Sequence, residues 1–181
     1  GGSDKPESVM HPGNVKQGFW DGPLQIDGSV HVYGSSPDKG AAFRGKVSGA
    51  GELLLSSGWF HFYSAENDFT APGTMRITTT SSYKPYRQGI AAYANGALPL
   101  SCPRVSITNG ACALLDAARF DLPPVEFYAT EGTNLEFYCA HAAPQTGTLA
   151  GLRKDGPGSV SYRVPLAVTG VVEAVEGVVD T

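Results

Sequence analysis

The stretch GAGELLLSSGWFHFYSAENDFT, residues 49–70, contains the features that decide the fold of this chain. A short apolar run at 52–55 follows Gly-Ala-Gly, and an aromatic run follows Gly58. Short runs with period-two alternation, closed by Gly, Asn, Asp or Pro, are typical of β-strands separated by turns. We therefore expect a corner at 49–51, a buried strand at 52–55, a second corner at Gly58 and a third at 67–70.

The same pattern recurs along the rest of the chain. Further runs begin at Pro23 (PLQIDGSVHVYG), Thr74 (TMRITTTS), Val125 (VEFYAT) and Gly158 (GSVSYRV). A helix requires an apolar stripe with helical periodicity, and the nearest candidate, GACALLDAARF at 110–120, is followed at once by Asp-Leu-Pro-Pro. The sequence therefore predicts an all-β chain of many short strands.

The composition limits both the number of domains and the class of partner. With 181 residues the chain is long enough for one sizeable core, so we expect one domain. Only 17% of the residues are charged, and the 23 Gly and 13 Pro are spread over the whole length, as in β proteins with many turns. The net charge of -4 provides no basic field for a phosphate backbone, which argues against nucleic acid as a partner.

The termini and the cysteines add three expectations. No window approaches the roughly 18 consecutive apolar residues of a membrane span, so we expect no insertion of this segment into a membrane. The chain begins with Gly-Gly-Ser, so we expect residues 1–3 to be an expression scar, or the chain to derive from a longer precursor. Cys102, Cys112 and Cys139 lack CxxC spacing, and we expect buried apolar residues rather than a zinc site.

Two segments, 45–77 and 151–179, share a pattern. In each, a Gly-x-Gly is followed by a polar residue, a short apolar run, an apolar residue with Thr, and a Gly that opens another strand. The alignment places 49–51 on 156–158. Clusters of short strands with unequal arcs between them favour a solenoid, in which each cluster is one coil.

An antiparallel architecture remains the alternative at this point. Asn-Gly occurs at 95–96 and at 109–110, and this dipeptide is the strongest short hairpin signal. An antiparallel β-sandwich or jelly roll would use both as tight turns between neighbouring strands.

The segment 45–77 resembles the autotransporter-associated β-strand repeat. The pattern of that family runs Gly-x-Gly, Leu-x-Leu, Asn-x-Tyr/Phe-Thr-Gly, and then Thr and Gly before a final apolar strand. The residues that match are Gly49, Gly51, Leu53, Leu55, Asn67, Phe69, Thr70, Gly73 and Met75. The chain departs from the pattern at Ala71-Pro72, where Gly would follow the Thr, and in a longer, more aromatic insert at 59–66.

The resemblance implies a right-handed parallel β-helix, the fold of large secreted or surface-exposed bacterial proteins of this family. We accordingly expect a solenoid domain at 24–181, and an N-terminal segment at 1–23 that covers one end as a cap, with Trp20 near its end. In such a solenoid the inward side chains form apolar ladders, and glycines allow the backbone to turn corners.

The resemblance also implies a function and a location. It indicates a structural or adhesive passenger or stalk, secreted or displayed at the bacterial cell surface in association with the outer membrane, which needs no cofactor. Surface or host glycans and neighbouring solenoid domains are the implied partners. The alternatives are a glycan-binding module of a carbohydrate-active protein and, second, a polysaccharide lyase or hydrolase.

No pattern of residues indicates catalysis. The carboxylates Asp116 and Asp121, and likewise Glu66 and Asp68, are close in sequence but are expected to be solvated turn residues rather than a catalytic pair. The four histidines are far apart and show no metal-ligand spacing, and no nucleophile elbow or phosphate-binding loop occurs. The sequence therefore predicts no catalytic residue, no metal site and no enzymatic activity.

Aromatic residues provide the one candidate binding surface. Trp59 and Tyr63 belong to the run WFHFY, and Tyr83, Tyr86 and Arg87 lie in the loop sequence SSYKPYRQG. Exposed aromatic rings stack on sugar rings, so these five residues are the candidate glycan-binding set. The alternative is that successive members of WFHFY simply divide between core and surface, with the histidine of that run pointing out of the sheet.

Overall fold

The computed structural model describes residues 8–10, 17–34, 40–56, 58–69, 74–78, 89–95, 97, 105–108, 111–114, 119–128, 134–138, 146–162 and 164–180. All regular structure in these segments is β-strand. Within them, no helix is long and apolar enough to cross a membrane.

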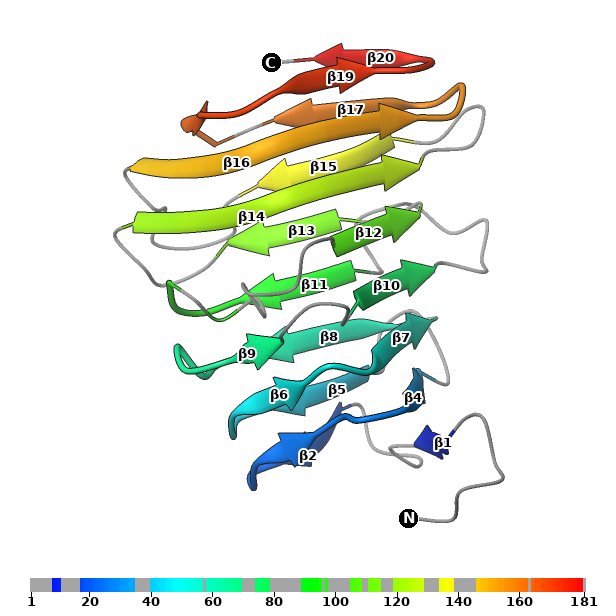
Figure 1. Ribbon diagram of the computed structural model, residues 1–181, viewed down its shortest axis with the longest axis vertical. Helices are drawn as coiled ribbons and strands as arrows, with labels where there is room; N and C mark the ends of the chain where they lie inside the picture. The colour runs from blue at the N-terminus through cyan, green and yellow to red at the C-terminus, as the bar shows by residue number, and fades with distance from the viewer. Residues whose placement is uncertain are drawn as a thin grey trace.

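The strands form three sheets (Figure 1). The first sheet contains β1 (Ser8–Met10), β4 (Ser29–Tyr33), β7 (Glu52–Ser56), β10 (Thr74–Thr78), β12 (Val105–Thr108), β14 (Arg119–Tyr128), β16 (Thr146–Asp155), β18 (Leu166–Val168) and β19 (Val172–Ala174). The second contains β2 (Gln17–Trp20), β5 (Gly40–Phe43), β8 (Trp59–Phe62), β11 (Gly89–Ala92), β13 (Ala111–Leu114), β15 (Asn134–Tyr138), β17 (Ser159–Tyr162) and β20 (Val178–Asp180). The third contains β3 (Leu24–Gln25), β6 (Val47–Gly49) and β9 (Asp68–Phe69).

The chain is a parallel β-solenoid, as the sequence predicted. All the hydrogen-bonded strand pairs among the described segments are parallel, and each sheet takes its strands in chain order. Each level adds one strand to a sheet, except that β18 and β19 both pair with the long strand β16. Ser29 bonds to Glu52 one level later, 23 residues on, and Arg153 bonds to Glu173, 20 residues on. The antiparallel sandwich is therefore wrong. Asn95 lies in a turn after β11, but β11 pairs with β13 in parallel, so this turn is not a hairpin. The Asn-Gly dipeptide at 109–110 lies outside the described residues.

The core consists of inward columns of apolar side chains, one side chain from each level. Leu53 and Leu55 are fully buried, and Leu53 pairs with Val30 on one side and with Met75 on the other. Glu52 and Leu54 are only half-buried, so the strand expected at 52–55 is buried on one face rather than throughout. The stacked rings of Phe43 and Phe62, 5.1 Å apart, form a neighbouring column.

The predicted corner at 49–51 is present and requires glycine. Gly49 has a φ of 122°, and an added Cβ there would lie 2.1 Å from the carbonyl oxygen of Ile26 in the level before. Gly58 lies between β7 and β8, as expected. At 67–70, only Asn67 is a corner, because Asp68–Phe69 form β9, while Thr70 lies outside the described residues.

The alignment of the two Gly-x-Gly motifs is wrong. Gly49 and Gly51 connect β6 of the third sheet to β7 of the first. Gly156 and Gly158 instead connect β16 of the first sheet to β17 of the second. Both motifs turn the chain, but at different corners of the solenoid. Glycine with positive φ suits any tight corner, so the motif does not identify the corner at which it lies.

The segment at 1–23 contributes strands to both large sheets. β1 pairs with β4, and β2 pairs with β5, at the N-terminal end of the stack. The role of this segment as a cap stays a prediction.

Candidate functional site

Aromatic side chains from two adjacent strands meet on the outer surface of the second sheet. In β8, Phe60 and Phe62 are fully buried, while Trp59 and His61 point outward and are half-buried. Tyr63 follows the strand and is 37% exposed. The run WFHFY therefore does divide between core and surface, since side chains alternate across a strand.

Tyr93 completes this surface from the next level. Its ring stacks on Tyr63 with centroids 4.1 Å apart and an interplanar angle of 9°, and it stacks on His61 at 5.7 Å. The Tyr93 hydroxyl and Nδ1 of His61 are 2.9 Å apart and share a hydrogen bond. The Trp59 ring lies 6.4 Å from that of His61. We call Trp59, His61, Tyr63 and Tyr93 the aromatic face.

Small residues support the aromatic face from neighbouring strands. Ala42 of β5 and Ala91 of β11 pair with His61 on either side, and both are almost completely covered. One level further, the exposed ring of Phe19 pairs with Ala42 and carries the Arg44 guanidinium 4.2 Å from its centroid. Alanines at these positions leave room for the large rings to lie against the sheet.

The aromatic face is uncharged at neutral pH. Burial lowers the pKa of His61 from its ordinary value of 6.5, so the imidazole is neutral. A neutral surface of aromatic rings with hydroxyl and imidazole edges is suited to contact with uncharged, hydroxyl-rich ligands.

The sequence predicted this surface only in part. Trp59 and Tyr63 are on it, whereas Tyr83, Tyr86 and Arg87 lie outside the described residues. Tyr93 was not in the candidate set, although it stands at the centre of the cluster. Its position depends on the register of β11 against β8, which places Ala92 beside Phe62 and hence Tyr93 beside Tyr63.

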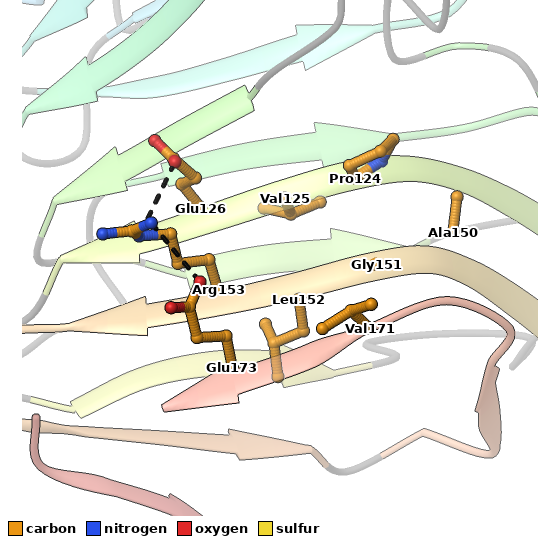
Figure 2. Close-up of a pocket in the computed structure, with 9 residues that line it drawn as sticks. All are labelled: Pro124, Val125, Glu126, Ala150, Gly151, Leu152, Arg153, Val171 and Glu173. Carbon is orange, nitrogen blue, oxygen red and sulfur yellow. Dashed lines mark hydrogen bonds and ion pairs between the residues drawn. The ribbon is translucent and has the colours of Figure 1, made fainter. Parts of the chain in front are cut away.

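A shallow groove lies on the outer side of the first sheet near the C-terminal end (Figure 2). It has a volume of about 370 Å³, and it is lined by Pro124, Val125, Glu126, Ala150, Gly151, Leu152, Arg153, Val171 and Glu173. Its polar wall is the guanidinium of Arg153, whose Nη1 lies 3.3 Å from Glu173 and whose Nε lies 3.9 Å from Glu126. Because all three side chains are partly exposed, these ion pairs contribute little to stability.

The structure describes three of the four carboxylates that were expected to be solvated turn residues. Asp121 lies in strand β14 rather than in a turn, and Asp116 is outside the described residues. The hydrogen bond from Thr148, followed by that from Arg119, lowers the pKa of Asp121, whereas a general acid of glycoside hydrolysis needs a raised one. Glu66 is in a turn, as expected, but Asp68 is in β9.

In the part of the chain that the structure describes, no three His, Cys, Asp or Glu side chains cluster as ligands of a metal ion. Comparison of the chain with family models, with curated proteins and with solved structures gives no match. The resemblance to the autotransporter-associated repeat therefore stays a prediction from the residues that carry it.

Proposed function

We propose that this chain is a rigid stalk module of a secreted or surface-displayed bacterial protein. The observation that carries the proposal is the continuous stack of parallel strands, in which each level pairs with the next through two sheets over the whole described length. A solenoid of this kind holds its ends at a fixed separation, because each level contacts only its neighbours. The location follows from the resemblance to the autotransporter-associated repeat.

Antibody labelling of intact cells that produce the protein tests this proposal. An antibody raised against residues 1–181 should label intact cells, or bind protein in the culture medium. The same cells after permeabilisation provide the control for total protein. Labelling that appears only after permeabilisation would contradict a surface or secreted location.

A second candidate function is supported by the aromatic face, which we propose contacts neutral glycans. Trp59 and Tyr63 supply rings at the surface, and Tyr93 fixes the ring of Tyr63 by stacking. Such ring pairs contribute about 0.5–1.5 kcal/mol beyond the area that they bury, so Tyr63 is held in place before a ligand arrives. This arrangement would make the stalk adhesive.

The test is binding of the chain to a panel of neutral polysaccharides, namely cellulose, xylan and chitin. Trp59→Ala and Tyr63→Ala should each weaken binding at least about tenfold, or about 1.4 kcal/mol. Tyr33→Ala is the matched control, because Tyr33 has the same 37% exposure as Tyr63 but lies on the first sheet. Equal binding by all three variants, or no binding by the unaltered chain, would remove the glycan proposal and leave the stalk proposal intact.

A further inference from the structure

His61 belongs to the aromatic face and uses one of its two ring nitrogens there. Nδ1 is 2.9 Å from the Tyr93 hydroxyl, and the two share a hydrogen bond. Among the residues that the structure describes, no group is bonded to the other ring nitrogen, Nε2. Because the side chain is half-buried, Nε2 is a polar atom whose hydrogen bond must come from water or from a ligand.

Two aromatic rings lie close to this imidazole. The Tyr93 ring stacks on it with an interplanar angle of 28°, and the Trp59 ring lies 6.4 Å from it. Trp59 and Tyr93 both pack on Ala91 of β11. Gly89, which pairs with Trp59 in the same strand, has no side chain to hold the indole away from the sheet. A sugar ring that stacks on Trp59 therefore brings its hydroxyl groups close to the imidazole.

The imidazole is matched to a hydroxyl rather than to an ion. Because burial lowers the pKa of His61, the ring is neutral at neutral pH, with one donor and one acceptor nitrogen. Nε2 donates if the Tyr93 hydroxyl donates to Nδ1, and it accepts if Nδ1 donates to the hydroxyl. A sugar hydroxyl can both donate and accept, so it suits either tautomer. The residues that pair with His61 are Ala42 and Ala91, so neither neighbouring strand places a charge beside it.

We infer, on the basis of the glycan contact proposed above, that His61 selects the ligand through a hydrogen bond between Nε2 and one hydroxyl of a neutral glycan. Trp59 and Tyr63 supply stacking, which accepts many sugars. The hydrogen bond supplies discrimination, because a site that bonds a hydroxyl rejects an analogue that lacks it. Tyr93 is a positioning residue, since its bond to Nδ1 fixes the tautomer and orientation of the imidazole.

A double-mutant cycle between protein and ligand tests this inference. The probes are short oligosaccharides of cellulose, xylan and chitin, together with the monodeoxy derivatives of the one that binds most tightly. By calorimetry, loss of one particular hydroxyl should weaken binding to the unaltered chain about fivefold. His61→Phe should weaken binding of the parent oligosaccharide by a similar factor, and the variant should be insensitive to loss of that same hydroxyl.

His31→Phe is the matched control. His31 is also a half-buried histidine in a strand, but it lies on the first sheet, so this variant should bind every probe as the unaltered chain does. A second measurement on the unaltered chain does not depend on the folding of a variant. With ¹⁵N-labelled histidine, the Nε2 resonance of His61 should shift when the oligosaccharide is added, whereas that of His31 should not.

The outcomes separate this inference from the glycan proposal on which it rests. If Trp59→Ala weakens binding but His61→Phe does not, the glycan proposal stands and the role of His61 is overturned. The role is also overturned if His61→Phe weakens binding of the parent and of every deoxy derivative by the same factor, because the substitution then acts on structure alone. An unaltered chain that binds no oligosaccharide would remove the glycan proposal and the role of His61 together.

Discussion

At the scale of the residue, the corners depend on single side chains that bond to more than one level. Asn67 is 8% exposed, and its Oδ1 accepts the N–H of Val47 at 2.8 Å. Its Nδ2 donates to the carbonyl oxygen of Ala97 in the following level. One amide therefore satisfies a buried donor and a buried acceptor from two different levels.

Asn67→Ala should therefore destabilise the fold strongly. It leaves two buried backbone groups without partners, and each costs about 1–3 kcal/mol, so the free energy of unfolding in urea should fall by about 2 kcal/mol or more. Asn95→Ala is the control, because Asn95 also forms hydrogen bonds across levels, to Asp121, but is exposed. Water replaces the lost hydrogen bonds, so the free energy of unfolding should fall by less than about 1 kcal/mol. Equal losses for the two variants would contradict the role assigned to Asn67.

Lys154 is a buried charge that sequence reasoning did not single out. Its Nζ is fully buried and donates to the carbonyl oxygens of Asp155, Gly156 and Glu176, at 2.7, 2.5 and 3.0 Å. The three donors of the ammonium group are thus all used at the corner between β16 and β17. Burial lowers the pKa of Lys154, and the nearby Asp155 and Glu176 oppose this effect. Alternating apolar residues give no indication that a lysine fills an inward position.

Lys154→Met should cost the fold about 3 kcal/mol or more, because breaking a buried charged hydrogen-bond set leaves its partners unsatisfied. Unfolding in urea provides the measurement. Arg153→Met is the control, since Arg153 points outward and its ion pairs are exposed. A loss for Lys154→Met no larger than that for Arg153→Met would show that the buried ammonium is not needed at this corner.

The aromatic face should make stability depend on pH through His61. The pKa of His61 is lower in the folded protein than the ordinary 6.5, because of burial. Below about pH 6.5 the unfolded chain therefore binds more protons, so stability is complete above that pH and falls as the pH drops towards the folded-state pKa. His61→Phe retains a ring against Tyr93 and should flatten this part of the pH profile. An unchanged profile in thermal or urea unfolding would contradict the assignment.

At the scale of the element, close approach of neighbouring strands decides where glycine is required. A Cβ added at Gly40, the first residue of β5, would lie 1.6 Å from the carbonyl oxygen of Trp59 in β8. Gly28, by contrast, has no atom within 4 Å of an added Cβ.

Gly40→Ala should therefore prevent β5 from pairing with β8 and abolish the native thermal transition, or lower its midpoint sharply. Gly28→Ala should be neutral or should stabilise the fold slightly, by up to about 1 kcal/mol, because it restricts only the unfolded chain. Thermal unfolding of both variants, followed by circular dichroism, provides the comparison. A normal transition for Gly40→Ala would mean that the two strands are further apart than the structure has them.

The sequence predicts which segments are strands better than it predicts how they pair. Alternation identifies β7 and β8 and the outward positions of Trp59 and Tyr63, since side-chain period is a local property. The partner of each strand depends on the length of the arc between levels, which varies along the chain, so the meeting of Tyr63 with Tyr93 was not predicted. The run from Val125 was expected as a strand, but the first half of β14 was missed, because Pro123-Pro124 indicates a break. The strand instead continues through both prolines, and Pro124 pairs with Gly151 of β16, a long strand that was also missed.

At the scale of the whole molecule, the solenoid is a column of levels with a repeated outer surface. At one register position of the first sheet, His31 pairs with Leu54, and the backbone register continues through Arg76, Ser106, Glu126 and Arg153 to Glu173. The function proposed for the chain follows from this regularity, because the stack provides length and the second sheet carries the aromatic face.

Distances between spin labels along this position test the stacking most directly. With the native cysteines replaced, labels at 31 and 126 are separated by four strand-to-strand steps, and labels at 31 and 173 by six. At about 4.8 Å for each step, the expected separations are about 19 Å and about 29 Å, increasing in proportion to the number of levels. Separations that do not increase in this proportion, or a shorter distance for the pair 31 and 173 than for 31 and 126, would contradict the parallel solenoid.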